Sequence, residues 1–355
     1  MKTELLKYLC DPYGDNAEFE LIDIVLGDND EIETGTLVSS YGNYYPIING
    51  IPRILSDDFL ISLSPVSEDW IKKYKPNMNV PIITLQVEVA KSFESEWKKF
   101  SNITEEFRNI FNNYFNLWQE KKTFGNNVLD AGCGMGRWAY YSSKKAGKLF
   151  CVDISQAIDV AKNNVNSDNS YFVQADLTKL PFKNNIFDAA YSLGVLHHIP
   201  DTLSALKELK NKIVDGGDLL TYFYYSLDNR PLYFKFLFHI SNLVRNFVSR
   251  LPKKLAHMIS WILAVIVYMP FIQIGKLFNL IGLTKVAKQI PLYEGYKNAN
   301  FYIIYNDSVD RFTTPLEKRY SKEEIIGMYE KLNFKDIQVQ NDIPYWVTNG
   351  IKSHS

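Results

Sequence analysis

Cysteine is scarce in this chain, and its charges nearly cancel. The 355 residues include three cysteines, Cys10, Cys133 and Cys151, at spacings that form no Cys-x-x-Cys pair. Nothing therefore indicates a disulfide framework, and residues 1–20 lack the pattern of a signal peptide, so we expect a reducing cytoplasm. The 39 basic and 40 acidic side chains give a net charge of −1, which argues against a surface built to bind nucleic acid.

Glycines gather at the end of one apolar run. Residues 128–137 read Val-Leu-Asp-Ala-Gly-Cys-Gly-Met-Gly-Arg, in which a buried strand ends in an acid and three alternating glycines follow. Glycine lets the backbone turn sharply and approach a ligand where a Cβ would clash. We expect a helix over residues 137–145 whose N-terminal amides face the same crevice. In a dinucleotide fingerprint the last glycine would occupy position 137, which is Arg137 here, so a dehydrogenase is disfavoured. The positions expected to bind a cofactor are Asp130, Gly132, Gly134 and Gly136.

This run resembles the first motif of class I S-adenosylmethionine (SAM)-dependent methyltransferases. The next two predicted strands also end in acids, at Asp153 and Asp176. An acid about 20 residues beyond a glycine-rich turn is placed to accept from both ribose hydroxyls, which predicts this role for Asp153. The resemblance implies that Asp176 accepts from the adenine amino group, although a strand-end aspartate also commonly caps a helix. Ile154 and Leu177, which follow these acids, are expected to contact the cofactor as well.

Residues 187–201 resemble the fourth motif of the same family. In that family the backbone after the strand passes beneath the methionine part of the cofactor, and the corresponding residues are Ser192, Leu193 and Gly194. His197 and His198 come next. Transfer of a methyl group to a hydroxyl requires removal of its proton, so these histidines are candidate bases. The alternative is that they only pack or hydrogen-bond beside the cofactor.

Strands alternate with helices at this spacing throughout the middle of the chain. The pattern predicts an α/β fold with a doubly wound, mostly parallel, seven-stranded Rossmann-like sheet, with ligands outside the carboxyl ends of the strands. Because 355 residues exceed such a core, we expect additions to it. The expected parts are a small N-terminal module (1–56), a helical lid or linker (57–120), the SAM-binding core (121–225), a basic apolar helical insertion (226–305) and a C-terminal completion of the sheet (306–355).

The N-terminal module resembles the small zinc-ribbon proteins that partner or precede methyltransferases. The similar stretches are residues 5–13, 35–38 and 45–55. That family carries two Cys-x-x-Cys pairs, but here Tyr13 replaces the mate of Cys10, and the second pair is replaced within residues 38–41. A tetrahedral zinc site needs four soft or imidazole ligands, so we expect no metal and a β-rich remnant held by aromatic side chains.

Aromatic residues at helical spacing mark the segment before the glycine motif. Their ordinary role is to pack against the sheet. In related methyltransferases, however, helices that precede the first motif close over the cofactor. Phe93 and Trp97 are the residues that we expect in such a lid.

The insertion carries the basic excess of the chain. Residues 227–300 hold ten cations and two acids, a net charge of +8 that leaves −9 for the remainder. A basic amphipathic helix begins at Pro231, and residues 258–275 then run for 18 residues without a charge, near the minimum for crossing a bilayer. One crossing is excluded, because the chain must return to complete the sheet. A cap over the acceptor site or a dimer interface, a monotopic or re-entrant contact of residues 231–283 with an anionic membrane, and a paired crossing all stay open.

We therefore expect a SAM-dependent methyltransferase with a small-molecule or lipid-linked acceptor. O-methylation of a glycan or of a lipid-linked small molecule is the leading reaction, and C-methylation of a quinone-like lipid is the alternative that residues 196–198 (Leu-His-His) suggest. A SAM-binding scaffold without turnover is a third reading. No nucleic-acid partner is expected, since in the insertion aliphatic side chains outnumber the cations that could reach phosphates, and no basic stacking groove is evident. The expected location is the cytoplasm, either free or peripheral on the inner membrane face, and the oligomeric state is left open.

Overall fold

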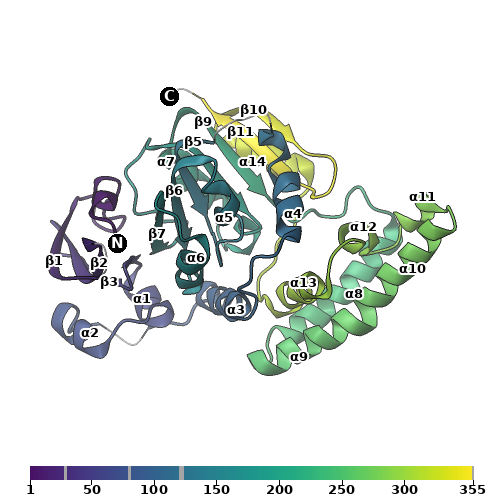
Figure 1. Ribbon diagram of the computed structural model, residues 1–355, viewed down its shortest axis with the longest axis horizontal. Helices are drawn as coiled ribbons and strands as arrows, with labels where there is room; N and C mark the ends of the chain where they lie inside the picture. Colours follow the sequence, from purple (N-terminus) through teal and green to yellow (C-terminus); the bar gives the residue numbers. More distant parts are fainter. Residues whose placement is uncertain (28–29, 79–80, 120–123, 354–355) are drawn as a thin grey trace. The chain divides into compact units, whose positions relative to one another are not determined.

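The computed structural model describes residues 1–27, 30–78, 81–119 and 124–353 (Figure 1). The chain divides into a core unit (Met1–Tyr225 and Lys318–Ser355) and an inserted unit (Ser226–Glu317). The structure thus ends the insertion at Glu317, beyond the expected residue 305, because helix α13 (Phe301–Thr313) packs against α9 (Lys253–Leu263). The expected boundary between residues 120 and 121 lies outside the described residues.

The core unit contains a sheet and the helices that flank it. Its strands are β1 (Phe19–Leu26), β2 (Ile32–Ser39), β3 (Tyr44–Ile48), β4 (Ile51–Ile54), β5 (Gly125–Ala131), β6 (Ala146–Asp153), β7 (Ser170–Ala175), β8 (Phe187–Leu193), β9 (Ile213–Tyr222), β10 (Phe334–Val339) and β11 (Val347–Lys352). Its helices and helical turns are η1 (Thr3–Lys7), α1 (Asp57–Leu63), α2 (Glu68–Tyr74), α3 (Leu85–Lys99), α4 (Glu106–Tyr114), η3 (Asn116–Trp118), α5 (Ala139–Ser142), α6 (Ala157–Val165), η4 (Leu196–His198), α7 (Thr202–Lys212) and α14 (Lys322–Lys331).

All eleven described strands belong to one sheet, in the order β1-β2-β3-β4-β7-β6-β5-β8-β9-β11-β10. Neighbours from β4 to β9 are parallel, and the five pairs at the two ends are antiparallel. The prediction of a seven-stranded, mostly parallel sheet is therefore not confirmed. Seven strands run from β7 to β10 in this order, and β1 to β4 extend the sheet beyond β7.

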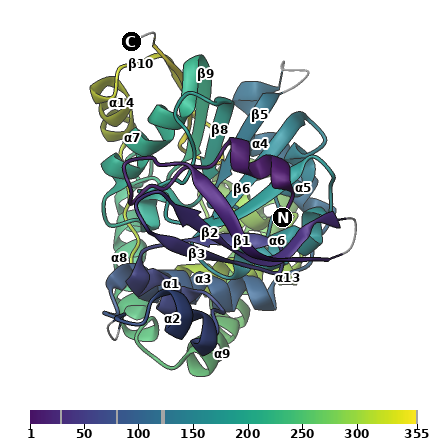
Figure 2. The ribbon, with the colours of Figure 1, turned by 90° about the vertical axis from the view of Figure 1, so that its left-hand side faces the viewer.

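The N-terminal strands β1, β2 and β3 lie side by side in Figure 2, and β4 joins them to the sheet by pairing in parallel with β7. Arg53 on β4 is fully buried, and its guanidinium binds the Asp159 carboxylate at 2.7 Å and the Gln174 side chain at 3.2 Å. A buried charge is tolerated when it is paired and hydrogen-bonded, as it is here. This contact and the continuous apolar core make strands β1 to β4 an extension of the sheet.

Asp11 organises the start of the chain, next to the position of the expected Cys-x-x-Cys remnant. Its buried carboxylate accepts hydrogen bonds from the side chains of Ser39, Asn43 and Tyr45 at 2.7 to 2.8 Å, and from the backbone of Tyr13 at 3.0 Å. The three side-chain donors come from β2, β3 and the turn between them. One carboxylate thus ties the start of the chain to β2 and β3. The likeness to zinc-ribbon proteins itself stays a prediction.

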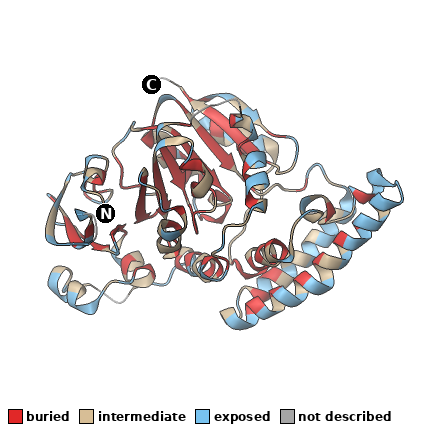
Figure 3. Ribbon diagram, viewed as in Figure 1, coloured by how far each residue is buried: buried red, intermediate tan, exposed pale blue. Residues whose placement is uncertain are grey.

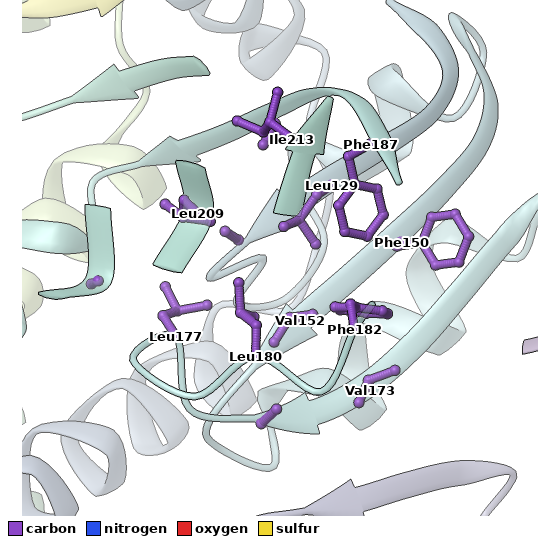
Figure 4. Close-up of a cluster of buried hydrophobic side chains, with 14 of the residues drawn as sticks. Leu129, Phe150, Val152, Val173, Leu177, Leu180, Phe182, Phe187, Leu209 and Ile213 are labelled. Carbon is purple, nitrogen blue, oxygen red and sulfur yellow. The ribbon is translucent and has the colours of Figure 1, made fainter. Parts of the chain in front are cut away.

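The core of the sheet consists of alternating apolar side chains (Figure 4). Leu129, Phe150 and Val173 project from adjacent strands and pack with Leu209 of α7. The residues that alternate with them along the same strands, such as Val128, are buried as well. Both faces of the central parallel strands are therefore covered, as such strands require (Figure 3).

Side-chain caps mark the starts of two helices in the core unit. Helix α7 spans Thr202–Lys212 and is capped by Asp201, and α14 begins with a capping box between Ser321 and Glu324. The helix expected over residues 137–145 is shorter, because α5 spans only Ala139–Ser142. Strand β6 begins soon afterwards, at Ala146, to pair with β5.

The inserted unit is helical. Its helices are α8 (Leu232–Val248), α9, the π-helical turn η5 (Ala264–Tyr268), α10 (Met269–Leu280), α11 (Thr284–Ala287), α12 (Tyr293–Tyr296) and α13. Helices α9, η5 and α10 form one continuous helix, Lys253–Leu280, which is long and apolar enough to cross a membrane by length and composition. A small core that includes Val248, Tyr268 and Phe312 joins it to α8 and α13.

Candidate functional site

A cleft lies in the core unit at the carboxyl ends of β5, β6, β7 and β8. It contains roughly 820 Å³ of space, which includes space open to solvent. The turn after β5, the ends of the other strands and helix α3 supply its walls. The predicted site residues that line it are Gly132, Gly134, Asp153, Ile154, Asp176, Leu177, Leu193, Gly194 and His198.

Four other predicted site residues lie outside the lining. Asp130 is buried under the turn, where its carboxylate accepts a hydrogen bond of 2.8 Å from the Tyr191 hydroxyl. Ser192 is buried and donates to the carbonyl of Ala131. Gly136 faces α6, since a Cβ there would lie 3.0 Å from Ala161. His197, the fourth, is buried behind His198.

The glycine turn needs its glycines for two reasons. Gly132 and Gly134 have φ angles of +86° and +53°, in the left-handed region that side chains disfavour. A Cβ on Gly134 would also lie 2.9 Å from Nε1 of Trp97 across the cleft. The turn is tied to the next strand, because the backbone amides of Gly132 and Cys133 both donate to the carbonyl of Val152.

Asp153 supports the glycine turn and also faces the cleft. Its Oδ2 accepts from the amide of Gly134 at 2.9 Å, and its Oδ1 accepts from the amide and hydroxyl of Ser155 at 2.9 and 2.7 Å. Because a carboxylate has about four acceptor positions, these bonds leave about one on Oδ2 for a ligand hydroxyl. Burial raises the pKa of Asp153 above the usual aspartate range.

Asp176 occupies the end of β7 at another part of the cleft. Its carboxylate accepts from the amide of Thr178 at 2.9 Å and from the side chain of Gln86 on α3. The first of these bonds is the local cap expected of a strand-end aspartate. Burial raises the pKa of the Asp176 carboxyl. Asp176 therefore connects the strand end to the helix above it.

Helix α3 covers the cleft with one face. Phe93 and Trp97, the expected lid residues, both line the cleft, together with Gln86, Val89 and Ala90. Apart from the adjacent pair Val89 and Ala90, these positions recur at intervals of three or four residues, which is the signal that would have identified the other three members. By contrast, Phe107 and Phe111 of α4 are buried in the core.

Sequence reasoning also missed the role of Arg137. Its guanidinium lies 4.7 Å from the centre of the Trp97 ring and 4.6 Å from that of Trp138, so that it is held between two aromatic faces. All three side chains line the cleft. Arg137 thus connects α3 to the segment that follows the glycine turn.

The two histidines differ in their surroundings. His198 lines the cleft, with its ring 4.9 Å from that of Phe93. His197 stacks on Tyr224 at 3.9 Å, and no described group forms a hydrogen bond with either of its ring nitrogens. Burial lowers the pKa of His197 well below the usual histidine range, so its imidazole is neutral at physiological pH. Only His198 is placed to reach a molecule in the cleft.

Part of the core unit that contains the cleft is similar to known proteins. Residues 129–221 match the family model of the methyltransferase domain. Demethylmenaquinone methyltransferase from Staphylococcus aureus (strain JH9) is 33% identical over 128 residues, covering 33% of this chain and 53% of that protein. The chain thus spans about half the length of the curated relatives that it matches. Residues 129–221 form a SAM-dependent methyltransferase domain.

The methyltransferase domain also has distant likenesses among solved structures. Magnesium protoporphyrin IX methyltransferase from Synechocystis PCC 6803, with bound S-adenosylhomocysteine, is 12% identical, with a TM-score of 0.43 and coverage of 75% of this chain and 98% of that one. An N-methyltransferase from Bradyrhizobium japonicum WM9, in complex with the same compound, is 17% identical, with a TM-score of 0.34 and coverage of 38% and 74%.

The cleft of the methyltransferase domain fits SAM. Asp153 and Asp176 supply acceptors for hydroxyl and amino donors, and apolar side chains such as Ile154 and Leu177 offer a surface for a planar base. Gly134 keeps the cleft open, since a Cβ there would close the gap to Trp97. When bound, SAM supplies a methyl group activated on a sulfonium.

Asp130 should make the folding stability of the methyltransferase domain depend on pH. Burial raises the pKa of this carboxyl to about 8. Between about pH 4 and pH 8 the unfolded chain loses the proton while the folded protein keeps it, so stability falls as the pH rises. Asp130→Asn retains an acceptor for the Tyr191 hydroxyl but cannot ionise. In denaturant unfolding, we expect the gain in the free energy of unfolding from this substitution to be larger at pH 7.5 than at pH 5, by on the order of 2–3 kcal/mol. An equal change at both pH values would contradict the buried ionisation.

Proposed function

We propose that the whole protein is a SAM-dependent methyltransferase that methylates a ring carbon of a quinone-like lipid. The observation that carries this proposal is the 33% identity to demethylmenaquinone methyltransferase over 128 residues. The cleft supports it, because the residues near His198 are apolar or aromatic, among them Phe93 and Ile199. Such walls suit a planar lipophilic ring better than a sugar, whose hydroxyls need polar partners.

In this reaction, different side chains of the cleft would have different roles. Asp153 and Asp176 would bind and orient the cofactor through its ribose and adenine. Helix α3 would exclude water with Phe93 and Trp97, which lie over the cleft. A bond forms between the methyl group and the acceptor carbon as the bond to sulfur breaks, and the acceptor loses a proton. We assign the acceptance of that proton to His198.

The acceptor can be tested with the purified full chain and methyl-labelled SAM. We expect label on a ring carbon of a reduced demethylated naphthoquinone with a short isoprenoid tail, located by mass spectrometry and NMR. O-methylation of a glycan or a lipid-linked sugar was the leading expectation from the sequence, and such acceptors belong in the same assay. Label on a sugar hydroxyl but not on the quinone would overturn the proposal. Tight SAM binding without transfer to either would favour a scaffold.

The role of His198 can be separated from packing by comparison with its neighbour. His198→Ala should lower kcat by about 10²-fold or more if it accepts the proton, while the affinity for SAM stays near that of the wild type. His197→Ala is the matched control, because this ring is buried behind His198 and outside the lining. If both variants lose SAM binding together with activity, the histidines only pack. Single-turnover kinetics and calorimetry provide the two measurements.

A further inference from the structure

Helix α8 of the inserted unit exposes a row of large apolar side chains. They follow one another at steps of three or four residues, which places them on one face of the helix. Their exposed fractions run from 44% to 82%. The row consists of Leu232, Phe236, Ile240, Leu243 and Phe247. Another face of the helix, which includes Val248, packs in the core of the unit. The apolar surface of α8 therefore extends beyond what the core covers.

The continuous helix Lys253–Leu280 has the same property. Buried residues occur at every fourth position from Ala256 to Ile272, and the apolar ones belong to the small core. On other sides it exposes Ile266 and Leu277 at 62% and 58%. Its most apolar window has a mean hydropathy of 2.0, yet only 33% of that window is buried (Figure 3). A core helix of this composition in a soluble protein would be mostly buried.

Charges of one sign accompany this apolar surface. Residues 229–293 contain nine lysines and arginines and no aspartate or glutamate, in a chain that has 40 acids elsewhere. Lys254 lies at the start of the long helix and Lys276 near its end, and both are exposed. Lys235 on α8 and Lys285 on α11 are exposed as well. Cations at the ends of an exposed apolar helix suit the headgroup region of an anionic lipid surface.

We propose that the inserted unit docks in the plane of an anionic lipid bilayer through α8 and the helix Lys253–Leu280. The surface of a second copy would carry the same positive charge, which opposes pairing between copies. A single crossing is excluded, because β9 before the insertion and β10 after it belong to the same sheet. The long helix extends about 42 Å at 1.5 Å per residue, enough to present both of its basic ends along the surface. This inference does not depend on the identity of the methyl acceptor.

Vesicle sedimentation of the full chain tests the proposal without any assay of turnover. The protein should sediment with phosphatidylcholine vesicles that contain phosphatidylglycerol, and much less with phosphatidylcholine alone. Raising the salt concentration should release it, because screening weakens the attraction between the lysines and the headgroups. The affinity for SAM, measured under each of these conditions, shows whether the protein stays folded.

Two sets of variants separate the charges from the apolar row. Lys254→Glu/Lys276→Glu/Lys285→Glu should weaken partitioning by about a hundredfold, given the contribution of each surface cation. Lys207→Glu/Lys335→Glu, at exposed lysines of the core unit, is the control and should bind as the wild type does. Leu243→Gln/Phe247→Gln should weaken partitioning at least about tenfold. Its control is Val25→Gln/Leu26→Gln, which changes similarly exposed apolar residues on β1.

Three outcomes would overturn the proposal. Absence of sedimentation with anionic vesicles at low salt would do so directly. Binding that resists both high salt and alkaline carbonate would indicate a paired crossing instead of a surface contact. A dimer in solution that Leu243→Gln/Phe247→Gln dissociates, without vesicle binding by the wild type, would assign the apolar row to a second copy of the chain.

Discussion

Replacement of Gly134 by valine is expected to abolish SAM binding, with a dissociation constant raised at least about 100-fold, equivalent to about 2.7 kcal/mol or more. Two effects act together. A Cβ at this position would lie 2.9 Å from Nε1 of Trp97, so the valine side chain would occupy the cleft. The φ angle of +53° is also unfavourable for a β-branched residue and costs on the order of 1–3 kcal/mol. Isothermal calorimetry with SAM measures the loss.

A second glycine separates the steric effect from backbone strain. Gly216 has a φ angle of +80°, and a Cβ there would have no described atom within 4 Å. Gly216→Val should therefore destabilise folding through strain but leave the affinity for SAM unchanged. If Gly134→Val bound SAM within threefold of the wild type, or if Gly216→Val lost binding equally, the cleft would not be where SAM binds.

The sequence predicted the parts of the fold that depend on short-range signals. The glycine run and the acids that end successive strands each occupy a few consecutive residues, and the structure places them as expected. The pairing of β4 with β7 could not be predicted in this way. It joins Arg53 to Asp159 and Gln174, more than a hundred residues away, and each of these residues alone resembles an ordinary surface residue.

The site shows the same division between local and distant information. Sequence position identified Asp153 and Asp176 at the strand ends, but it could not show which way each neighbouring side chain points. Asp130 and Ser192 face buried partners on adjacent strands instead of the cleft, because successive side chains of a strand alternate between its two faces. The aromatic contacts of Arg137 required the packing of α3, which no pattern around the glycines reveals.

Removal of the Asp153 carboxylate is the second substitution with a large expected effect. Asp153→Ala should weaken SAM binding by about 1.5–3 kcal/mol, because it deletes a charged acceptor that faces the cleft. It also removes the acceptor for the amide of Gly134, which helps to fix the glycine turn. Ser155→Ala is the matched control. It loses one donor to Asp153 but keeps the carboxylate, so its effect on SAM affinity should be several-fold smaller.

A ligand that lacks the ribose hydroxyls distinguishes direct contact from support of the turn. If Asp153 binds a hydroxyl, its substitution should matter much less for a 2′,3′-dideoxy analogue of S-adenosylhomocysteine than for the parent compound, and the double-mutant comparison gives the coupling free energy. Equal losses with both ligands would mean that Asp153 acts only through Gly134. Acidification provides an independent check. Burial raises the pKa of Asp153, so its carboxylate takes up a proton at a higher pH than an ordinary aspartate does. As the pH falls, the wild type should therefore lose affinity for SAM at that higher pH. Asp153→Ala should not show this loss.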